Sequence, residues 1–171
     1  MVGTRRKPRQ QRIDGRGLGV AMTTRLKDFA TSQVAVVEPE TSALVVSRLM
    51  RQHHIGALVV VEAGGTNRPI GIVTDRDLVL ELMSEGLDPE VFTAGDIMSV
   101  DLVLADPEMD AMDAVELMKT NRLRRLVLAD KNGTLAGIVT MEDVLLLLTR
   151  ELANLTSGIA GARDREVRER A

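Results

Sequence analysis

The residues best suited to chemistry form one short pattern that occurs twice. Gly-Ile-Val-Thr-x-x-Asp spans Gly71–Asp77 and again Gly137–Asp143. In both places an apolar run typical of a strand leads into a helical pattern near the threonine. A Thr three residues before an Asp at such a junction is typical of a capping box, which closes the first turn of a helix. One copy alone indicates no more than a helix cap.

The same residues also have the chemistry of a nucleotide site. The free N–H groups and positive dipole end of a helix N-terminus suit phosphate, and the hydroxyls of Thr74 and Thr140 can donate to it. Asp77 and Asp143 can accept hydrogen bonds from both hydroxyls of a ribose. The glycine lets a flat base approach the strand backbone closely. Because capping and binding can share the threonine, the repetition favours a nucleotide site.

An internal repeat positions the two motifs. Displacing the chain by 68 residues aligns Lys27–Glu62 with Gly95–Asp130, and the motifs follow after a two-residue contraction. Each copy has the order β-α-β-β-α. The first copy predicts elements at Val34–Val37, Thr41–Gln52, Ala57–Val61, Ile70–Val73 and Asp75–Ser84. The second copy predicts elements at Leu102–Ala105, Asp110–Asn121, Leu126–Ala129, Ala136–Val139 and Met141–Leu152.

This duplicated unit resembles the cystathionine β-synthase-type (CBS) domain pair. The resemblance rests on the element order, Pro39 and Pro107 after the first strands, the Asp-Ile-Met segment Asp96–Met98 and the duplicated motif, and it covers about Met22 to Leu152. It implies an α/β fold in which two repeats pack sheet to sheet with pseudo-two-fold symmetry. It also implies two clefts that bind adenosine-containing ligands.

The resemblance assigns roles to individual residues. It implies that Asp77 and Asp143 bind ribose and that Thr74 and Thr140 bind phosphate. The residues expected to line the clefts around the base are Gly71, Ile72, Val73, Gly137, Ile138 and Val139. We expect AMP, ADP or ATP as the ligand, with S-adenosylmethionine and NAD as alternatives that carry the same adenosine group.

Two arginines distinguish the second repeat. Arg124 and Arg125 immediately precede the main run of its second strand, where the first repeat has Gly56 and Ala57. Guanidinium groups suit phosphate oxygens, and the resemblance places basic residues of related regulatory subunits at this position against nucleotide phosphates. We therefore predict phosphate contact by Arg124 or Arg125, with solvated surface charge as the alternative. The sequence leaves open which cleft these arginines serve.

Several function classes are excluded or disfavoured by composition. The chain has no cysteine, which excludes disulfides, thiolate zinc sites and thiol nucleophiles and fits a reducing cytoplasm. The adjacent His53 and His54 cannot both face one metal from a helix. No nucleophile with a neighbouring base is recognisable, and the apolar run Val144–Leu148 is too short to span a membrane. We expect a cytoplasmic regulatory module that signals to an unknown effector protein, with neither catalysis nor a metal.

Charge divides the chain unevenly. The net charge is −3, yet the first 16 residues hold six basic side chains and one acidic one. We expect a disordered basic arm at 1–21, CBS repeats at 22–90 and 91–156, and a charged tail at 157–171. The arm lacks aromatic residues that stack on bases, so we expect no nucleic-acid partner. A nucleic-acid-associated regulator and a docking module with unoccupied clefts remain the alternatives.

A homodimer is also expected. The resemblance implies pairing through helices, and a large exposed apolar patch is unusual on a monomer. The candidate contact residues are Val79, Leu82, Leu145 and Leu148.

Overall fold

The computed structural model describes residues 24–169, and side chains as far as residue 159. The basic arm expected at 1–21 therefore lies outside the described residues. The first repeat contains β1 (Val36–Val37), α1 (Ala43–His53), β2 (Ala57–Val61), β3 (Pro69–Thr74), α2 (Asp75–Asp77) and the π-helical segment η2 (Leu78–Met83). The second contains β4 (Leu104–Ala105), α4 (Ala111–Asn121), β5 (Arg125–Ala129), β6 (Leu135–Thr140) and α5 (Met141–Glu169). Two short helices precede the repeats, η1 (Leu26–Asp28) and α3 (Ala94–Ile97).

Each repeat builds a three-stranded sheet, in the order β1-β2-β3 and β4-β5-β6. The first pair of strands is parallel and the second pair antiparallel in both sheets. The registers correspond, since Val59 pairs with Ile72 and Val127 pairs with Ile138. The predicted β-α-β-β-α order, occurring twice, is confirmed.

The two sheets pack against each other through a layer of aliphatic side chains. Val59, Val61 and Val127 are buried there, and the half-buried residues around them are Val34, Ile72, Leu102, Leu135 and Ile138. Successive side chains of a strand point to opposite faces, so the remaining positions of each strand face the helices of its own repeat. The predicted sheet-to-sheet packing is confirmed.

Helices α1 and α4 begin and end alike. Ser42 and Asp110 cap their N-termini by accepting hydrogen bonds from the backbone N–H groups of Val45 and Met112. Both helices end at a non-glycine residue in the left-handed region, His54 and Arg122, each with φ of 55°. This turn directs the chain into β2 and β5 in the same way, and it places Arg122 directly before the second strand of its repeat.

The segment before each repeat packs on the other repeat. Leu26 is fully buried in the core of the second repeat, and its N–H donates to the Met109 carbonyl over 3.0 Å. Ala94 and Ile97 are buried in the core of the first repeat, where Gly95 donates to the Pro39 carbonyl over 2.8 Å. The sequence predicts that each segment opens the repeat that follows it. The 68-residue offset aligns the segments but carries no information about which core receives them.

Surface charges reinforce the first of these crossings. Lys27 lies 2.6 Å from a carboxylate oxygen of Glu108 in the second repeat, and Arg25 pairs with the other oxygen. These hydrogen bonds from Lys27 and Arg25 hold the pKa of Glu108 below its usual range.

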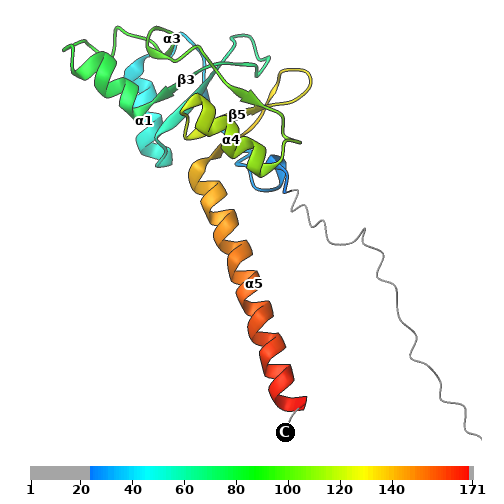
Figure 1. Cartoon of the computed structure of the whole chain (residues 1–171). Helices are drawn as coiled ribbons and strands as arrows, with labels where there is room; N and C mark the ends of the chain where they lie inside the picture. Colours follow the sequence, from blue (N-terminus) through cyan, green and yellow to red (C-terminus); the bar gives the residue numbers. More distant parts are fainter. Residues whose placement is uncertain (1–23, 170–171) are drawn as a thin grey trace, which may run out of the picture.

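Helix α5 extends far beyond its expected end. It runs to Glu169, well past the expected end at Leu152, and the tail predicted at 157–171 is helical to that residue. The reason is composition: residues 151–169 contain no proline and are rich in Ala, Leu, Glu and Arg, which are strong helix formers. Figure 1 shows α5 projecting away from the α/β body.

One of the predicted dimer-contact residues is placed elsewhere. Leu82 is 2% exposed and belongs to the core of the first repeat, where η2 packs against the sheet. Val79, Leu145 and Leu148 are exposed. In the part of the chain that the structure describes, no helix has both the length and the apolar character needed to cross a membrane.

Replacing Leu26 with alanine will lower the free energy of unfolding by about 2–5 kcal/mol, because it leaves a cavity in the core of the second repeat. Chemical denaturation monitored by circular dichroism measures this change. Leu80→Ala is the matched control, since Leu80 is 46% exposed. Equal, small effects from the two changes would show that η1 contributes nothing to the second core.

Candidate functional site

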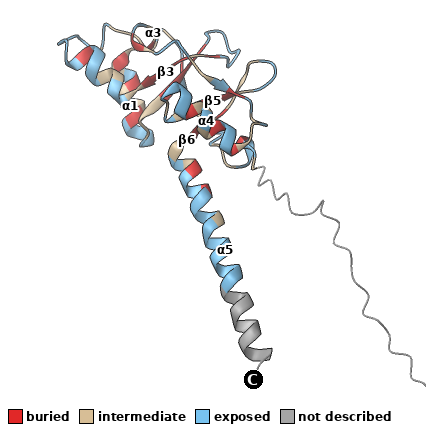
Figure 2. Cartoon of the chain, viewed as in Figure 1, coloured by how far each residue is buried: buried red, intermediate tan, exposed pale blue. Residues whose placement is uncertain are grey.

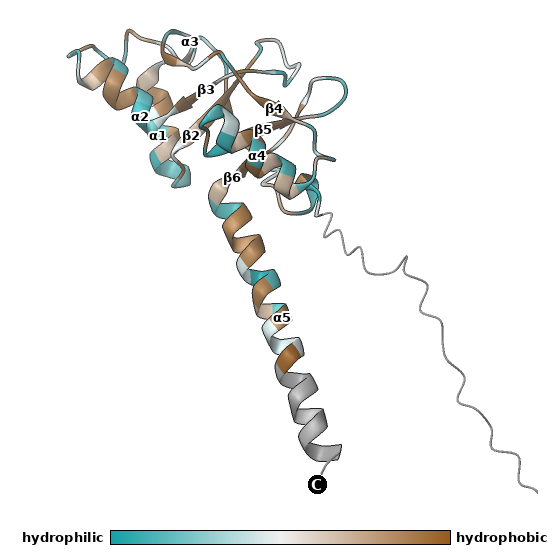
Figure 3. Ribbon diagram, in the orientation of Figure 1, coloured by the Kyte–Doolittle hydropathy of each residue, from teal (hydrophilic) through white to brown (hydrophobic). Residues whose placement is uncertain are grey.

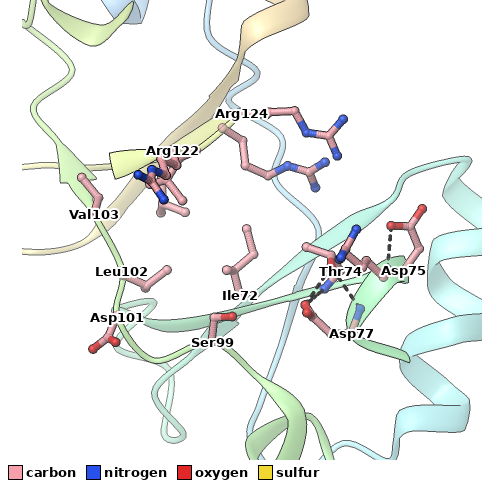
Figure 4. A pocket seen from close by; sticks show the side chains of 14 residues that line it. Ile72, Thr74, Asp75, Asp77, Ser99, Asp101, Leu102, Val103, Arg122 and Arg124 are labelled. Atoms are coloured by element: carbon pink, nitrogen blue, oxygen red, sulfur yellow. Dashed lines mark hydrogen bonds between the residues drawn. The ribbon is translucent and has the colours of Figure 1, made fainter. Parts of the chain in front are cut away.

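A cavity of about 240 Å³ lies between the two repeats (Figure 4). One wall comes from the end of β3 and from α2, with Thr74 and Asp77. The opposite wall comes from Arg122–Arg125, at the approach to β5. A third side is formed by Ser99–Val103, between α3 and β4. The cavity is therefore lined by the motif of the first repeat and by the arginines of the second. The sequence leaves open which cleft the arginines line, and the structure places them in the cleft of the first motif.

Thr74 and Asp77 form a complete capping box. The Thr74 backbone N–H and hydroxyl both donate to Asp77 Oδ2 over 2.7 Å, and the Asp77 N–H donates back to Thr74 Oγ1 over 3.3 Å. Asp77 Oδ1 receives no hydrogen bond from the described residues. The cap thus uses one carboxylate oxygen and leaves the other available as an acceptor. The Thr74 hydroxyl hydrogen is already used, so it can reach a phosphate only by leaving Asp77.

The same box occurs at two further places. Thr140 and Asp143 repeat it in the second repeat, with 2.7 Å between the hydroxyl and Asp143 Oδ2. Thr93 and Asp96 form a third box at the start of α3, with 2.8 Å for both bonds. The backbone and side-chain hydrogen bonds from Thr93 hold the pKa of Asp96 below its usual range. Neither Thr93 nor Asp96 lines the cavity, so a capping box by itself does not indicate a binding site. Asp77 differs from Asp96 because it lines the cavity.

Four guanidinium groups line the cavity, from Arg76, Arg122, Arg124 and Arg125, together with three carboxylates, from Asp75, Asp77 and Asp101. Figure 4 shows Arg122 and Arg124 across the cavity from Thr74 and Asp77. The half-buried Arg125 reaches over the repeat boundary, where its Nη1 donates to the Gly56 carbonyl over 3.4 Å. The cavity lining therefore carries an excess of positive charge.

The motif valines face the wrong way for the role expected of them. Val73 and Val139 are fully buried in the cores of their repeats, so their predicted place in the clefts is wrong. Strand alternation is the reason, since it turns every second residue of β3 and β6 toward the helices. Ile72 does line the cavity, and Ile138 lies in the layer between the sheets.

The space beside each motif glycine is occupied by other residues of the chain, and it is not open to a base. A Cβ on Gly71 would lie 2.3 Å from Met98 Sδ, and one on Gly137 would lie 3.0 Å from the Thr31 carbonyl oxygen. Both glycines are buried. The expectation that they line the clefts is therefore wrong, because the segment leading into the repeat occupies the space beside each of them.

The segment Ser99–Val103 is a part of the cavity wall that the motif does not reveal. Ser99 is held by two backbone hydrogen bonds with Ile72, of 2.9 and 3.1 Å. Thr31 is bonded to Ile138 in the same way, over 3.0 Å in both directions. The 68-residue offset aligns Ser99 with Thr31, so the internal repeat already indicated that these two residues occupy equivalent positions.

Comparison with known proteins assigns the chain to a family. The model of the CBS domain matches residues 26–84 and 94–150. The chain belongs to the CBS-domain family. It is 37% identical to the CBS domain-containing protein YhcV of Bacillus subtilis, over 79% of this chain and 91% of that one. It is 40% identical to an uncharacterized protein of Methanopyrus kandleri, of which it spans 59%.

Solved structures agree with this CBS architecture. An uncharacterized conserved protein from Pyrococcus horikoshii is 26% identical, with a TM-score of 0.66 over 74% of this chain and 92% of that one. A CBS domain pair in complex with 5′-methylthioadenosine and S-adenosyl-L-methionine has a TM-score of 0.67 over 75% and 98%, at 19% identity.

The equivalent positions around the motif of the second CBS repeat carry different side chains. At the positions that match Arg124 and Arg125 stand Gly56 and Ala57. At the positions that match Asp75 and Arg76 stand Met141 and Glu142. Thr140 and Asp143 keep the cap, but none of these matched positions carries a cation. The two CBS motifs are thus alike in their hydrogen bonds and unequal in charge.

Replacing Thr74 or Thr140 with alanine will lower the free energy of unfolding by about 1 kcal/mol in each case, because each change removes an N-cap acceptor. Thermal or urea denaturation of the two single variants measures this. Ser47→Ala is the control, since Ser47 lies inside α1 and its hydroxyl bonds only to the Leu44 carbonyl. Caps that contribute nothing would leave both threonine variants as stable as that control.

Proposed function

We propose that this CBS pair is a regulatory module that binds an adenosine nucleotide in the cavity between Asp77 and Arg124–Arg125. The observation that carries the proposal is the arrangement of the two walls. One wall presents a carboxylate oxygen left over from the cap, and the other presents guanidinium groups. A carboxylate acceptor and guanidinium donors thus stand on opposite sides of one cavity.

The cavity's chemistry suggests how the ligand is divided among its walls. Asp77 Oδ1 would accept from the ribose hydroxyls, and the cation-rich wall would take the phosphates. The aliphatic side chains that line the cavity offer an apolar surface for the base: Ile72, Leu102, Val103 and Val127. Thr74 would join the phosphate only after releasing Asp77. Thr140 and Asp143 would form a second, weaker subsite.

The proposed ligand is AMP, ADP or ATP, and S-adenosylmethionine and NAD carry the same adenosine group. The excess of guanidinium groups favours ligands with more phosphates. The CBS pair that binds methylthioadenosine and S-adenosylmethionine is related at 19% identity, so that likeness is one of fold. The ligand class in our proposal rests on the chemistry of the cavity itself.

The proposed role is sensing and not catalysis. The described lining contains no His, Cys or Lys, and its only hydroxyls belong to Ser99 and to the capping Thr74. A bound nucleotide would bridge both repeats, from Asp77 of the first to Arg124 of the second. Binding would thereby favour one relative position of the repeats, and an effector protein in the cytoplasm would respond to that change. An inosine-5′-monophosphate dehydrogenase of Thermoplasma acidophilum matches 82% of this chain over only 26% of its own length, consistent with a module separable from catalysis.

Asp77→Asn separates binding from capping. The asparagine oxygen can still accept the two bonds from Thr74, while its amide replaces the free acceptor with a donor. Stability will stay close to wild type, and the affinity for ATP or AMP, measured by calorimetry, will fall about 10- to 100-fold, the worth of one charge-assisted bond. Asp143→Asn will lower the affinity of the second subsite.

Asp96→Asn is the matched control for this test. It makes the same chemical change in the same box geometry, outside the cavity, and will leave binding unchanged. Wild-type affinity in both the Asp77 and the Asp143 variants would reduce the motif to a helix cap and contradict the proposal. Native mass spectrometry of freshly purified protein would identify a ligand carried through purification.

The double change Arg124→Ala/Arg125→Ala will reduce selectivity for phosphate number. Wild type will bind in the order ATP, ADP, AMP and adenosine, because each added phosphate gains charge-assisted contacts. The double variant will lose about 10- to 100-fold in ATP affinity and little for adenosine. Titrations at low and high salt will show that the lost selectivity is the salt-sensitive part.

Arg48→Ala/Arg51→Ala is the control, since it removes the same net charge from α1, outside the cavity lining. It will keep the wild-type order. If the Arg124/Arg125 variant also keeps both that order and the salt dependence, these arginines are surface charge only.

A further inference from the structure

The distal part of α5 has an unusual surface for a helix in water. Every side chain from Leu152 to Ile159 is exposed, and none of these eight residues is charged (Figure 2). The match to the CBS domain ends at residue 150. This stretch therefore lies beyond the module that forms the cavity, and it has no part in the proposed nucleotide site.

The exposed apolar residues of α5 follow one line along the helix. We call this line the apolar stripe; its members are Leu145, Leu148, Leu152, Leu155 and Ile159. They are 57%, 44%, 65%, 63% and 72% exposed. Successive members are three, four, three and four residues apart, which is the spacing of two-stranded coiled coils. The apolar residues along α5 are visible in Figure 3.

The stripe is distinct from the face that attaches α5 to the body. Val144 and Leu147 are buried there, at 1% and 6% exposure, whereas their neighbours Leu145 and Leu148 are open. A helix that leaves the body and continues for several turns gains nothing from packing, and isolated helices of this length are marginal in water. A second helix lying along the stripe would supply the missing burial.

We propose that the stripe pairs with the same stripe of a second copy of this chain, as a parallel two-stranded coiled coil. Of the positions that flank the stripe, Thr149, Thr156 and Gly158 are uncharged and Glu151 is charged. In a parallel pair Glu151 lies opposite Thr156 of the other copy, so two identical helices meet without like charges facing each other. A surface with a single flanking carboxylate offers little to attract a charged partner, and it lacks the basic residues that membrane-surface helices carry beside their apolar face.

Steric considerations select the parallel arrangement. An antiparallel pair that overlapped the whole stripe would direct residues 160–169 of each helix toward the α/β body of the other copy. A parallel pair leaves that end of both helices free, and it matches Leu152 with Leu152 and Leu155 with Leu155. The two CBS modules then lie side by side at the same end of the coiled coil.

Light scattering on the full chain tests the pairing. Wild type will have twice the 18.6 kDa mass of one chain, and Leu152→Ser/Leu155→Ser will shift to the mass of one chain at micromolar concentration. Leu146→Ser is the matched control, because Leu146 is 69% exposed and lies outside the stripe. Binding of ATP by the double variant, at wild-type affinity, will confirm that the modules are intact and that the nucleotide proposal stands or falls separately.

An introduced cysteine tests the orientation, because the chain has none of its own. Ile159→Cys will form a disulfide-linked dimer under mild oxidation, since a parallel pair brings the two copies of this position together. Ser157→Cys, outside the stripe, will not. A monomeric wild type, a dimer unaffected by Leu152→Ser/Leu155→Ser, or binding of the stripe to lipid vesicles in place of self-association would overturn the proposal. Failure of Ile159→Cys to cross-link a confirmed dimer would overturn its parallel form.

Discussion

The contact between the two sheets is the constraint on which the rest of the structure depends. Val59 and Val127, at the centre of that layer, are almost completely buried although neither belongs to the core of its own repeat. Burial of such side chains contributes about 1.5–3 kcal/mol each, so the layer fixes the two repeats firmly. Since Thr74 and Asp77 lie at the end of β3 and in α2, and Arg124 directly precedes β5 of the other sheet, the cavity exists only while this layer holds. The carboxylate and the arginines would otherwise have no common site.

The capping box and the cavity place two demands on one carboxylate. Asp77 Oδ2 completes the first turn after β3, and Oδ1, which receives no hydrogen bond from the described residues, belongs to a side chain that lines the cavity. A residue with a single acceptor oxygen could satisfy one demand only. In the box at Thr93 and Asp96 the carboxylate caps the helix but does not line the cavity. In our proposal, nucleotide binding therefore depends less on the motif itself than on the arginines that the opposite repeat places across the cavity from it.

The fold could be predicted well from the sequence because each strand, helix and motif pattern occurs in two copies that can be compared. The apolar strand patterns, the prolines after the first strands and the paired motifs of the two copies support one another, so the element order and the capping geometry were predicted. Gly71 and Val73 were wrongly expected to line a cleft. The prediction treated all residues of the motif alike, although successive residues of a strand point to opposite faces of the sheet. The crossing of η1 to the second core was not predictable, because a repeat is equally well completed by its own leading segment or by the other one. The Ser99–Val103 wall was missed for a related reason. The repeat aligns Ser99 with Thr31, but it does not show that backbone pairing with Ile72 brings Ser99 to the cavity.

That crossing has a consequence for the ancestry and the cooperativity of the chain. Leu26 completes the second core and Ala94 completes the first, so neither half contains all of its own interior. The arrangement is that of a segment-swapped dimer whose two subunits have been joined end to end. A protein with one such repeat would need a second molecule to fill its core, and gene fusion makes that encounter intramolecular. The segment at residues 84–93, between η2 and α3, thus replaces a concentration-dependent association, and the two halves must unfold together.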